Sequence, residues 1–213
     1  GGPQLLVREA EAAPNADEKA KLFSRAATLY SERLDENRTA AALLQRATEL
    51  RPDDRTLLLQ LCDVLNASGR SREAAEALQR IVDSYGGRRS KELGEIHRRL
   101  AAAYRAQGNN SDALRELDQA FRIEPGNVAV LKELGELAFE LEDLKKAQQM
   151  YRALLLQRLD GEAPITKAEV FLALGRVHEA LGEKPKARQM LERALQTDAN
   201  LAEAKRRLAE LAD

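Results

Sequence analysis

Few side chains in this 213-residue chain could carry out covalent or acid–base chemistry. A histidine can serve as a general base and a cysteine as a nucleophile or metal ligand, but each needs a convergent partner. His97, His178 and Cys62 stand singly among apolar and helix-forming residues. The sequence also lacks HExxH, CxxC and GxSxG motifs and a phosphate loop ending in Lys-Ser/Thr. We therefore expect packed histidines, a buried cysteine, no cofactor, no metal site and no enzymatic activity.

The overall composition excludes several other function classes. Lysine and arginine number 34 against 35 acidic residues, so no global field selects nucleic acid. No apolar run approaches the ~18 residues of a membrane-spanning helix. Cys62 is the one cysteine, which excludes an internal disulfide. The compartment stays unassigned: the cytoplasm is slightly favoured, and a periplasmic location fits if a leader has been removed. The abundance of Ala, Arg and Leu is typical of a GC-rich bacterial source.

A repeat in the sequence indicates the secondary-structure elements on which His97, His178 and Cys62 lie. One pattern of large and small apolar residues returns five times, at intervals of 34 to 40 residues. Ala, Leu, Glu, Arg, Lys and Gln, the best helix formers, dominate each copy, and no stretch alternates over strand length. The sequence therefore predicts an all-α chain. The copies begin near Leu22, Leu58, His97, Leu131 and Phe171.

Two positions of each copy are small, and large residues surround them at helical spacing. Small side chains let two antiparallel helices approach to about 8 to 10 Å between axes. One such pair cannot bury its apolar face alone, so neighbouring pairs must stack. The small residues at repeat position 8 are Ala27, Cys62, Ala101, Gly135 and Gly175. Those at position 20 are Ala40, Ala74, Ala113, Ala147 and Ala187.

On these residues the chain resembles the tetratricopeptide repeat (TPR) family. The resemblance implies an α-solenoid of antiparallel helix pairs that forms a right-handed superhelix, with about five copies and a C-terminal capping helix. We expect one array over 1–213. Residues 1–14 would be a remnant helix of a preceding repeat or a linker, so the chain would be part of a longer array. The expected repeats lie near 20–53, 55–87, 94–127, 128–161 and 168–200, and residues 201–213 form the cap.

Several local signals mark the expected helix starts. Asn15 and Thr166 are each followed by Glu at the third position, as in a capping box. Further N-cap candidates are Ser71, Ser111, Asn127 and Asp143. Two connections, 84–93 and 160–167, are longer than the rest. They are either added length between repeats or binding loops.

The resemblance also implies which residues would meet a partner. In the family, positions 2, 5, 9 and 12 of the first helices line the concave face. Here these positions gather basic side chains and one phenylalanine, with glutamates between them. Arginine can hold a carboxylate through two hydrogen bonds, and an aromatic ring can anchor an apolar side chain. The alternative is an ordinary solvated surface with ion pairs inside each helix. The candidate groove residues are Arg98, Arg105, Lys132, Glu136, Phe139 and Arg176.

The leading functional hypothesis is a non-catalytic scaffold or adaptor that binds a peptide or protein segment in the concave groove. The alternative is a regulatory or sensory module of a larger multidomain protein whose effector domain lies outside this segment. We expect no nucleic-acid partner. Self-association through an exposed N-terminal edge near Leu5, Leu6 and Val7 is a further hypothesis.

Overall fold

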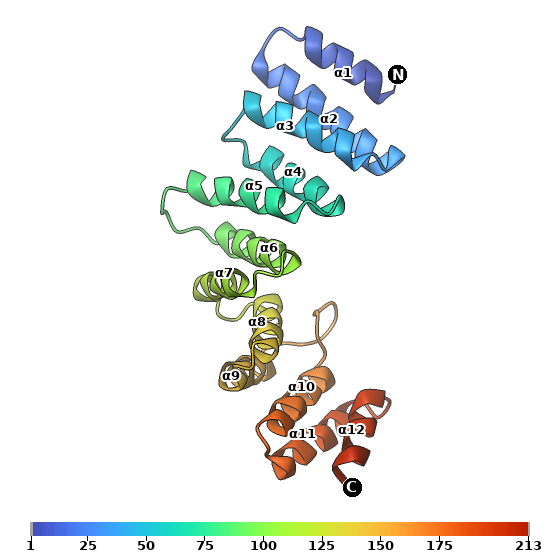
Figure 1. The fold of residues 1–213 in the computed structure, drawn as a ribbon, viewed down its shortest axis with the longest axis vertical. Helices are drawn as coiled ribbons and strands as arrows, with labels where there is room; N and C mark the ends of the chain where they lie inside the picture. The colour runs from blue at the N-terminus through green and yellow to red at the C-terminus, as the bar shows by residue number, and fades with distance from the viewer. Residues whose placement is uncertain (1, 213) are drawn as a thin grey trace. The chain divides into compact units, whose positions relative to one another are not determined.

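The computed structural model describes residues 2–212, and within that range the chain is helical with connecting loops and no strand. This confirms the predicted all-α class, and Figure 1 shows the helices in chain order. The helices are α1 (Pro3–Ala12), α2 (Ala16–Leu34), α3 (Asn37–Leu50), α4 (Arg55–Ala67), α5 (Ser71–Ser84), α6 (Glu92–Ala106), α7 (Asn110–Ile123), α8 (Val128–Glu140), α9 (Leu144–Leu155), α10 (Lys167–Ala180), α11 (Lys184–Thr197) and α12 (Ala202–Ala212).

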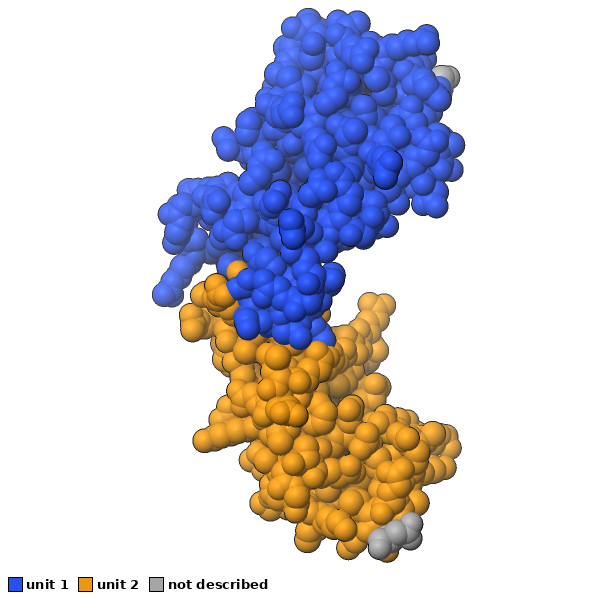
Figure 2. Space-filling model, in the orientation of Figure 1, with its two compact units in different colours: residues 1–113 blue, residues 114–213 orange. Residues whose placement is uncertain are grey.

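The chain divides into two compact units, residues 1–113 and 114–213 (Figure 2). Unit 1 holds α1 to α6 and the start of α7. Unit 2 holds the rest of α7 and α8 to α12. A single continuous array over residues 1–213 stays a prediction.

Within each unit, helices that follow one another in sequence pack together. In unit 1, α1 packs on α2, and contacts continue along the chain from α2 to α6. In unit 2 the same holds from α8 to α12. Large aliphatic side chains are fully buried between these helices, including Leu44, Leu58 and Leu78 in unit 1 and Leu131 and Leu154 in unit 2.

The small residues predicted at the helix crossings are buried, as the packing argument requires. The alanines at position 20 are all 0% exposed, and those at position 8 are at most 1% exposed. Gly135 and Gly175 are buried as well. Helix backbones can approach closely only where side chains are this small. The apolar core of each unit is therefore built around these crossings.

Polar caps fix several helix starts. The side chains of Asn15, Asn127 and Asp143 each accept a hydrogen bond from a backbone N–H in the first turn of the next helix. Thr166 and Glu169 form a complete capping box at the start of α10. Asp54 caps α4 in the same way and was not among the predicted N-caps.

The predicted N-caps Ser71 and Ser111 are wrong, because both residues lie inside their helices. In each case a glycine with positive φ, Gly69 or Gly108, ends the preceding helix. The tight turn that glycine permits starts α5 one residue earlier and α7 two residues earlier than the serine pattern suggests. At α7 the Asn109 side chain accepts the first-turn hydrogen bond instead.

Each long connection carries a buried anchor. In the first, the Tyr85 ring lies under the Arg55 guanidinium at 3.7 Å, and its hydroxyl donates to Glu92 at the start of α6. In the second, Ile165 is buried in the apolar core of unit 2 directly before the Thr166 cap. Both connections therefore secure the start of the next helix.

The two ends of the described chain differ in how well their apolar residues are covered. At α1, Leu6 and Val7 pack against the core of unit 1, and Leu5 is 47% exposed. At α12, Ala204 is buried, and Leu208 and Leu211 pack against the same cluster. Self-association through the α1 edge stays a prediction, now centred on Leu5.

Candidate protein-binding face

The predicted groove residues of unit 2 lie on one side of α8 and on α10. Lys132, Glu136 and Phe139 are spaced i, i+4 and i+7 along α8, which places them on one helix face. Arg176 of α10 lies at repeat position 9, the position that Glu136 has on α8. We call this surface the first-helix face of unit 2. The remaining two predicted residues, Arg98 and Arg105, lie on α6 in unit 1. Their place in a common groove with the unit 2 residues stays a prediction.

A small pocket opens on this face between three helices. Its volume is about 110 Å³. The Arg176 guanidinium carbon lies 4.9 Å from the centre of the Phe139 ring, a cation–π distance. We call it the Phe139–Arg176 pocket. Its lining residues are Glu136, Phe139 and Glu140 of α8, Tyr151 of α9, and Ala173 and Arg176 of α10.

Arg176 enters this pocket with unused hydrogen-bonding capacity. Its Nε is fully buried, and it has no hydrogen-bond partner among residues 2–212. A buried N–H without an acceptor costs about 1 to 3 kcal/mol, so such groups are rare in folded proteins. The guanidinium is held by stacking on Phe139 and by no recorded ion pair within the described chain. The buried Nε itself is closed to a ligand, but the guanidinium lines the pocket, so its terminal N–H groups can donate to a bound molecule.

Other predicted cations are paired within their own helices. Lys132 Nζ lies 2.6 Å from Glu136 Oε1, and Arg98 makes two 2.9 Å contacts with Glu95. These pairs are half-exposed, and such pairs contribute about 0 to 1 kcal/mol. The prediction of intrahelical ion pairs thus holds for Lys132 and Arg98. Arg105 is half-buried near the end of α6.

Tyr151 lines the pocket although it belongs to the second helix of its pair. A Cβ atom placed on Gly135 would lie 2.9 Å from Tyr151 Cζ, so the ring crosses α8 directly over this glycine. Burial, followed by the charges of Glu136 and Glu140 against that of Arg176, raises the pKa of Tyr151 to about 12. The phenol therefore stays protonated at neutral pH. The sequence indicates this arrangement, because two small residues on α8, Gly135 and Ala138, leave room for the large side chain of Tyr151.

A second group missed at the sequence level connects neighbouring first helices. Three long polar side chains at repeat position 6, those of Gln60, Arg99 and Arg207, reach back to the previous repeat. Gln60 bonds Thr28 Oγ1 at 2.9 Å and accepts from Ser24 Oγ at 2.6 Å. The other two contacts are Arg99–Asp63 at 2.8 Å and Arg207–Glu179 at 2.9 Å. These contacts fix the spacing of successive first helices.

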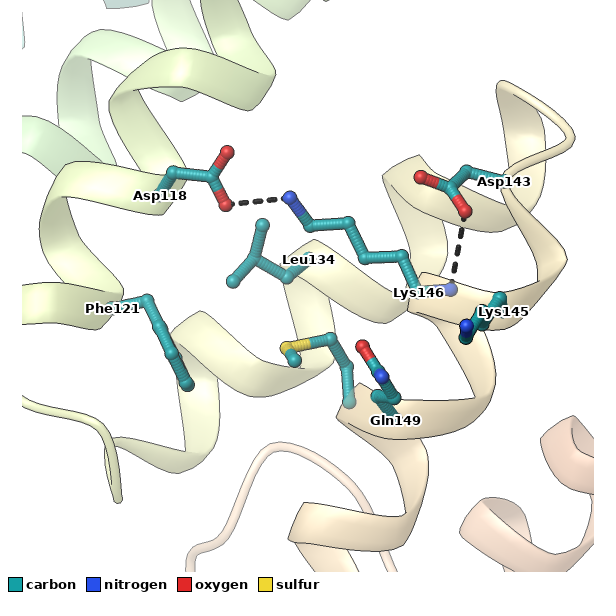
Figure 3. Close-up of a pocket in the computed structure, with 8 residues that line it drawn as sticks. Asp118, Phe121, Leu134, Asp143, Lys145, Lys146 and Gln149 are labelled. Carbon is teal, nitrogen blue, oxygen red and sulfur yellow. Dashed lines mark hydrogen bonds and ion pairs between the residues drawn. The ribbon is translucent and has the colours of Figure 1, made fainter.

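Unit 2 has a second hollow, between α7, α8 and α9 (Figure 3). Its volume is about 360 Å³, and Phe121, Leu134 and Met150 supply its apolar lining. Lys146 Nζ of α9 faces Asp118 of α7 across it at 2.7 Å, as Figure 3 shows. Asp143 accepts from the Lys146 backbone N–H. Lys145 and Gln149 complete the polar lining of this hollow, so it is the natural comparison site for the Phe139–Arg176 pocket.

The residues considered for catalysis are packed. Cys62 is fully buried, and burial raises the pKa of its thiol to about 11, which favours the protonated thiol at neutral pH. His178 is 3% exposed, and its Nδ1 lies 3.6 Å from Glu183, too far for a hydrogen bond. His97 is half-buried on α6. Among residues 2–212 no cluster of His, Cys, Asp or Glu has metal-site geometry, and no helix is both long and apolar enough to span a membrane.

Family models described as tetratricopeptide repeat match residues 33–93, 104–164 and 168–211. The chain belongs to the tetratricopeptide repeat family. Its paired helices are therefore those of a TPR solenoid, and TPR repeats indicate a protein–protein interaction scaffold.

The relatives and structural neighbours agree with this membership. Human protein O-mannosyl-transferase TMTC1 is 31% identical over 201 residues, which cover 91% of this chain and 21% of that protein. The chain thus spans about a fifth of the length of this relative. The MamA crystal structure superposes with a TM-score of 0.72 at 16% identity, covering 88% of this chain and 96% of MamA. YrrB, described as a TPR protein with an unusual peptide-binding site, superposes at 0.70 with 18% identity, covering 96% and 98%. These two likenesses concern the fold.

Proposed function

We propose that this TPR chain is a non-catalytic binding module that holds an extended peptide or partner segment on its first-helix face. The observation that carries the proposal is the Phe139–Arg176 pocket. It joins an aromatic ring and a guanidinium that stacks on the ring and makes no ion pair among residues 2–212. Aromatic and arginine side chains of this kind dominate the energy of protein interfaces.

The residues first considered for catalysis lie outside the Phe139–Arg176 pocket, which agrees with a binding role. The buried thiol of Cys62 has a raised pKa, His178 is buried, and His97 is half-buried. The 31% identical relative is named an O-mannosyl-transferase, and this chain corresponds to about a fifth of it. We therefore assign no transferase activity to these repeats.

The same length difference favours a second candidate. A TPR segment within a longer protein can regulate another domain of that protein or recruit binding partners to it. Under this second candidate the repeats bind a regulator or a substrate protein, and any catalysis belongs to the remaining sequence. The binding face would be the same in both cases. Capture experiments with the parent protein and with this chain alone distinguish the two.

Replacing Phe139 with alanine should reduce partner capture at least about tenfold, because removing an aromatic anchor commonly costs 1.4 kcal/mol or more. The ring also supports the Arg176 guanidinium, so its loss frees that side chain. The measurement is affinity capture by the parent protein, with the retained polypeptides identified and quantified.

The matched control is Phe121→Ala, which removes a half-buried ring from the hollow between α7, α8 and α9. Both variants should keep the helical content of the unmodified chain. If Phe121→Ala abolishes capture while Phe139→Ala leaves it intact, binding occurs at the other hollow, and the first-helix face is not the site.

A further inference from the structure

The Phe139–Arg176 pocket offers both donors and acceptors but little net charge. Arg176 supplies N–H groups, and the Tyr151 side chain, which also lines the pocket, supplies a hydroxyl. Glu136 and Glu140 supply carboxylate oxygens. A carboxylate has about four lone-pair sites, so an existing partner leaves it able to accept again.

The charges around the pocket disfavour an ionic guest of either sign. Counting Lys132, which pairs with Glu136, two cations face two carboxylates. A guest carboxylate would lie beside Glu136 and Glu140, and a guest ammonium would lie beside Arg176. Like charges placed this close repel strongly where water is largely displaced. A neutral polar group avoids both penalties.

Tyr151 gives this pocket a hydrogen-bond donor that the equivalent position of the other repeats lacks. At repeat position 24 the other four copies carry leucine, whose side chain has no hydrogen-bonding group. Gly135 and Ala138 leave space over α8, and the Tyr151 ring crosses it. A residue of the second helix thereby supplies a hydroxyl to the first-helix face. Its raised pKa keeps that hydroxyl a donor.

We propose that this pocket binds the side-chain carboxamide of an asparagine or glutamine in the partner segment, with Tyr151 as a specificity-determining residue. The inference rests on the proposed function, because it names what one pocket of that face accepts. The carboxamide oxygen accepts from Arg176 and from the Tyr151 hydroxyl. The carboxamide nitrogen donates to Glu136 or Glu140. The volume of about 110 Å³ accommodates the end of one side chain.

The test uses three small probes that share one backbone: the Nα-acetyl methylamides of glutamine, glutamate and lysine. Each is titrated into the isotope-labelled 213-residue chain at constant ionic strength, and resonances of Phe139, Tyr151 and Ala173 are followed by NMR. We expect saturable shifts with the glutamine probe. Its affinity should exceed that of the other two by about 3- to 10-fold, the effect of one net hydrogen bond.

Tyr151→Phe removes the hydroxyl and keeps the ring over Gly135. It should weaken the glutamine probe by about 3- to 10-fold and leave the weaker lysine and glutamate probes unchanged. The matched control is Tyr30→Phe, at a buried position of α2 in unit 1, which should change nothing. Unfolding curves of both variants verify that the fold is retained.

Three results would overturn the proposal: equal or tighter binding of a charged probe, an unchanged glutamine affinity in Tyr151→Phe, or no shift at these residues with any probe. The outcome is distinguishable from failure of the proposed function. If Phe139→Ala still abolishes partner capture while the glutamine probe fails, the face binds partners and the carboxamide assignment is wrong.

Discussion

Replacing Leu78 with alanine is expected to lower the free energy of unfolding by about 2 to 5 kcal/mol. Leu78 lies on α5 at repeat position 24, where it is 0% exposed and part of the core of unit 1. The truncation removes buried apolar surface and leaves a cavity, because neighbouring helices are already in close contact and cannot collapse into the space. Chemical denaturation followed by circular dichroism measures the loss.

The matched control removes the same atoms from a solvated leucine. Leu156, just after α9, is 85% exposed, so Leu156→Ala should change the stability by no more than about 0.5 kcal/mol. Similar losses for the two variants would contradict the assignment of position 24 to the interior of the helix stack.

The second large effect is expected at Gly135. Glycine within a helix is less favourable than alanine by about 1 kcal/mol, so Gly135→Ala would stabilise an unconstrained helix. Here the added Cβ would lie 2.9 Å from Tyr151 Cζ, inside the contact distance of the two carbons. The aromatic ring is rigid and 5% exposed, so it cannot move aside. Overpacking of this kind costs about 1 to 3 kcal/mol, and we expect a net loss.

Two comparisons make this test specific, with thermal and chemical denaturation as the readouts. At Gly175 the nearest atom to an added Cβ is Leu191 Cδ2 at 2.8 Å, the end of a flexible chain, so Gly175→Ala should cost less. Adding Tyr151→Leu to Gly135→Ala should restore much of the lost stability, since position 24 is leucine in the other copies. A stable Gly135→Ala variant, or no recovery in the double variant, would show that the ring does not occupy this crossing.

The helices and their crossings were predictable because their causes are local and repeated. Small residues at two fixed positions recur in all five copies, and five agreeing copies outweigh the irregularity of any one. Helix starts were less predictable: at Ser71 and Ser111 the positive φ of the preceding glycine decided the boundary. A prediction of a helix start from the N-cap residue alone does not take into account the conformation of the preceding turn.

The candidate pocket was predicted in part. Residues whose place follows from their position in the repeat were found, and residues whose place depends on contacts between helices were missed. The resemblance to the family placed Glu136, Phe139 and Arg176 on the first-helix face, and the structure brings them to one pocket. Tyr151 was missed because periodicity assigns it to the second helix layer. Its role depends on the missing side chain at Gly135, which lies on the preceding helix, α8. The contacts of Gln60, Arg99 and Arg207 to earlier repeats depend on side-chain reach, which spacing alone does not give.

The central claim is that nested helix pairs present their first helices to another polypeptide, and site-specific photo-crosslinking tests it most directly. A benzophenone amino acid replaces either Lys132, on the first-helix face of α8, or Lys145, at the hollow between α7, α8 and α9. We expect the probe at position 132 in the parent protein to crosslink the captured partner and the probe at position 145 not to do so. Efficient crosslinking at 145 with none at 132 would contradict it.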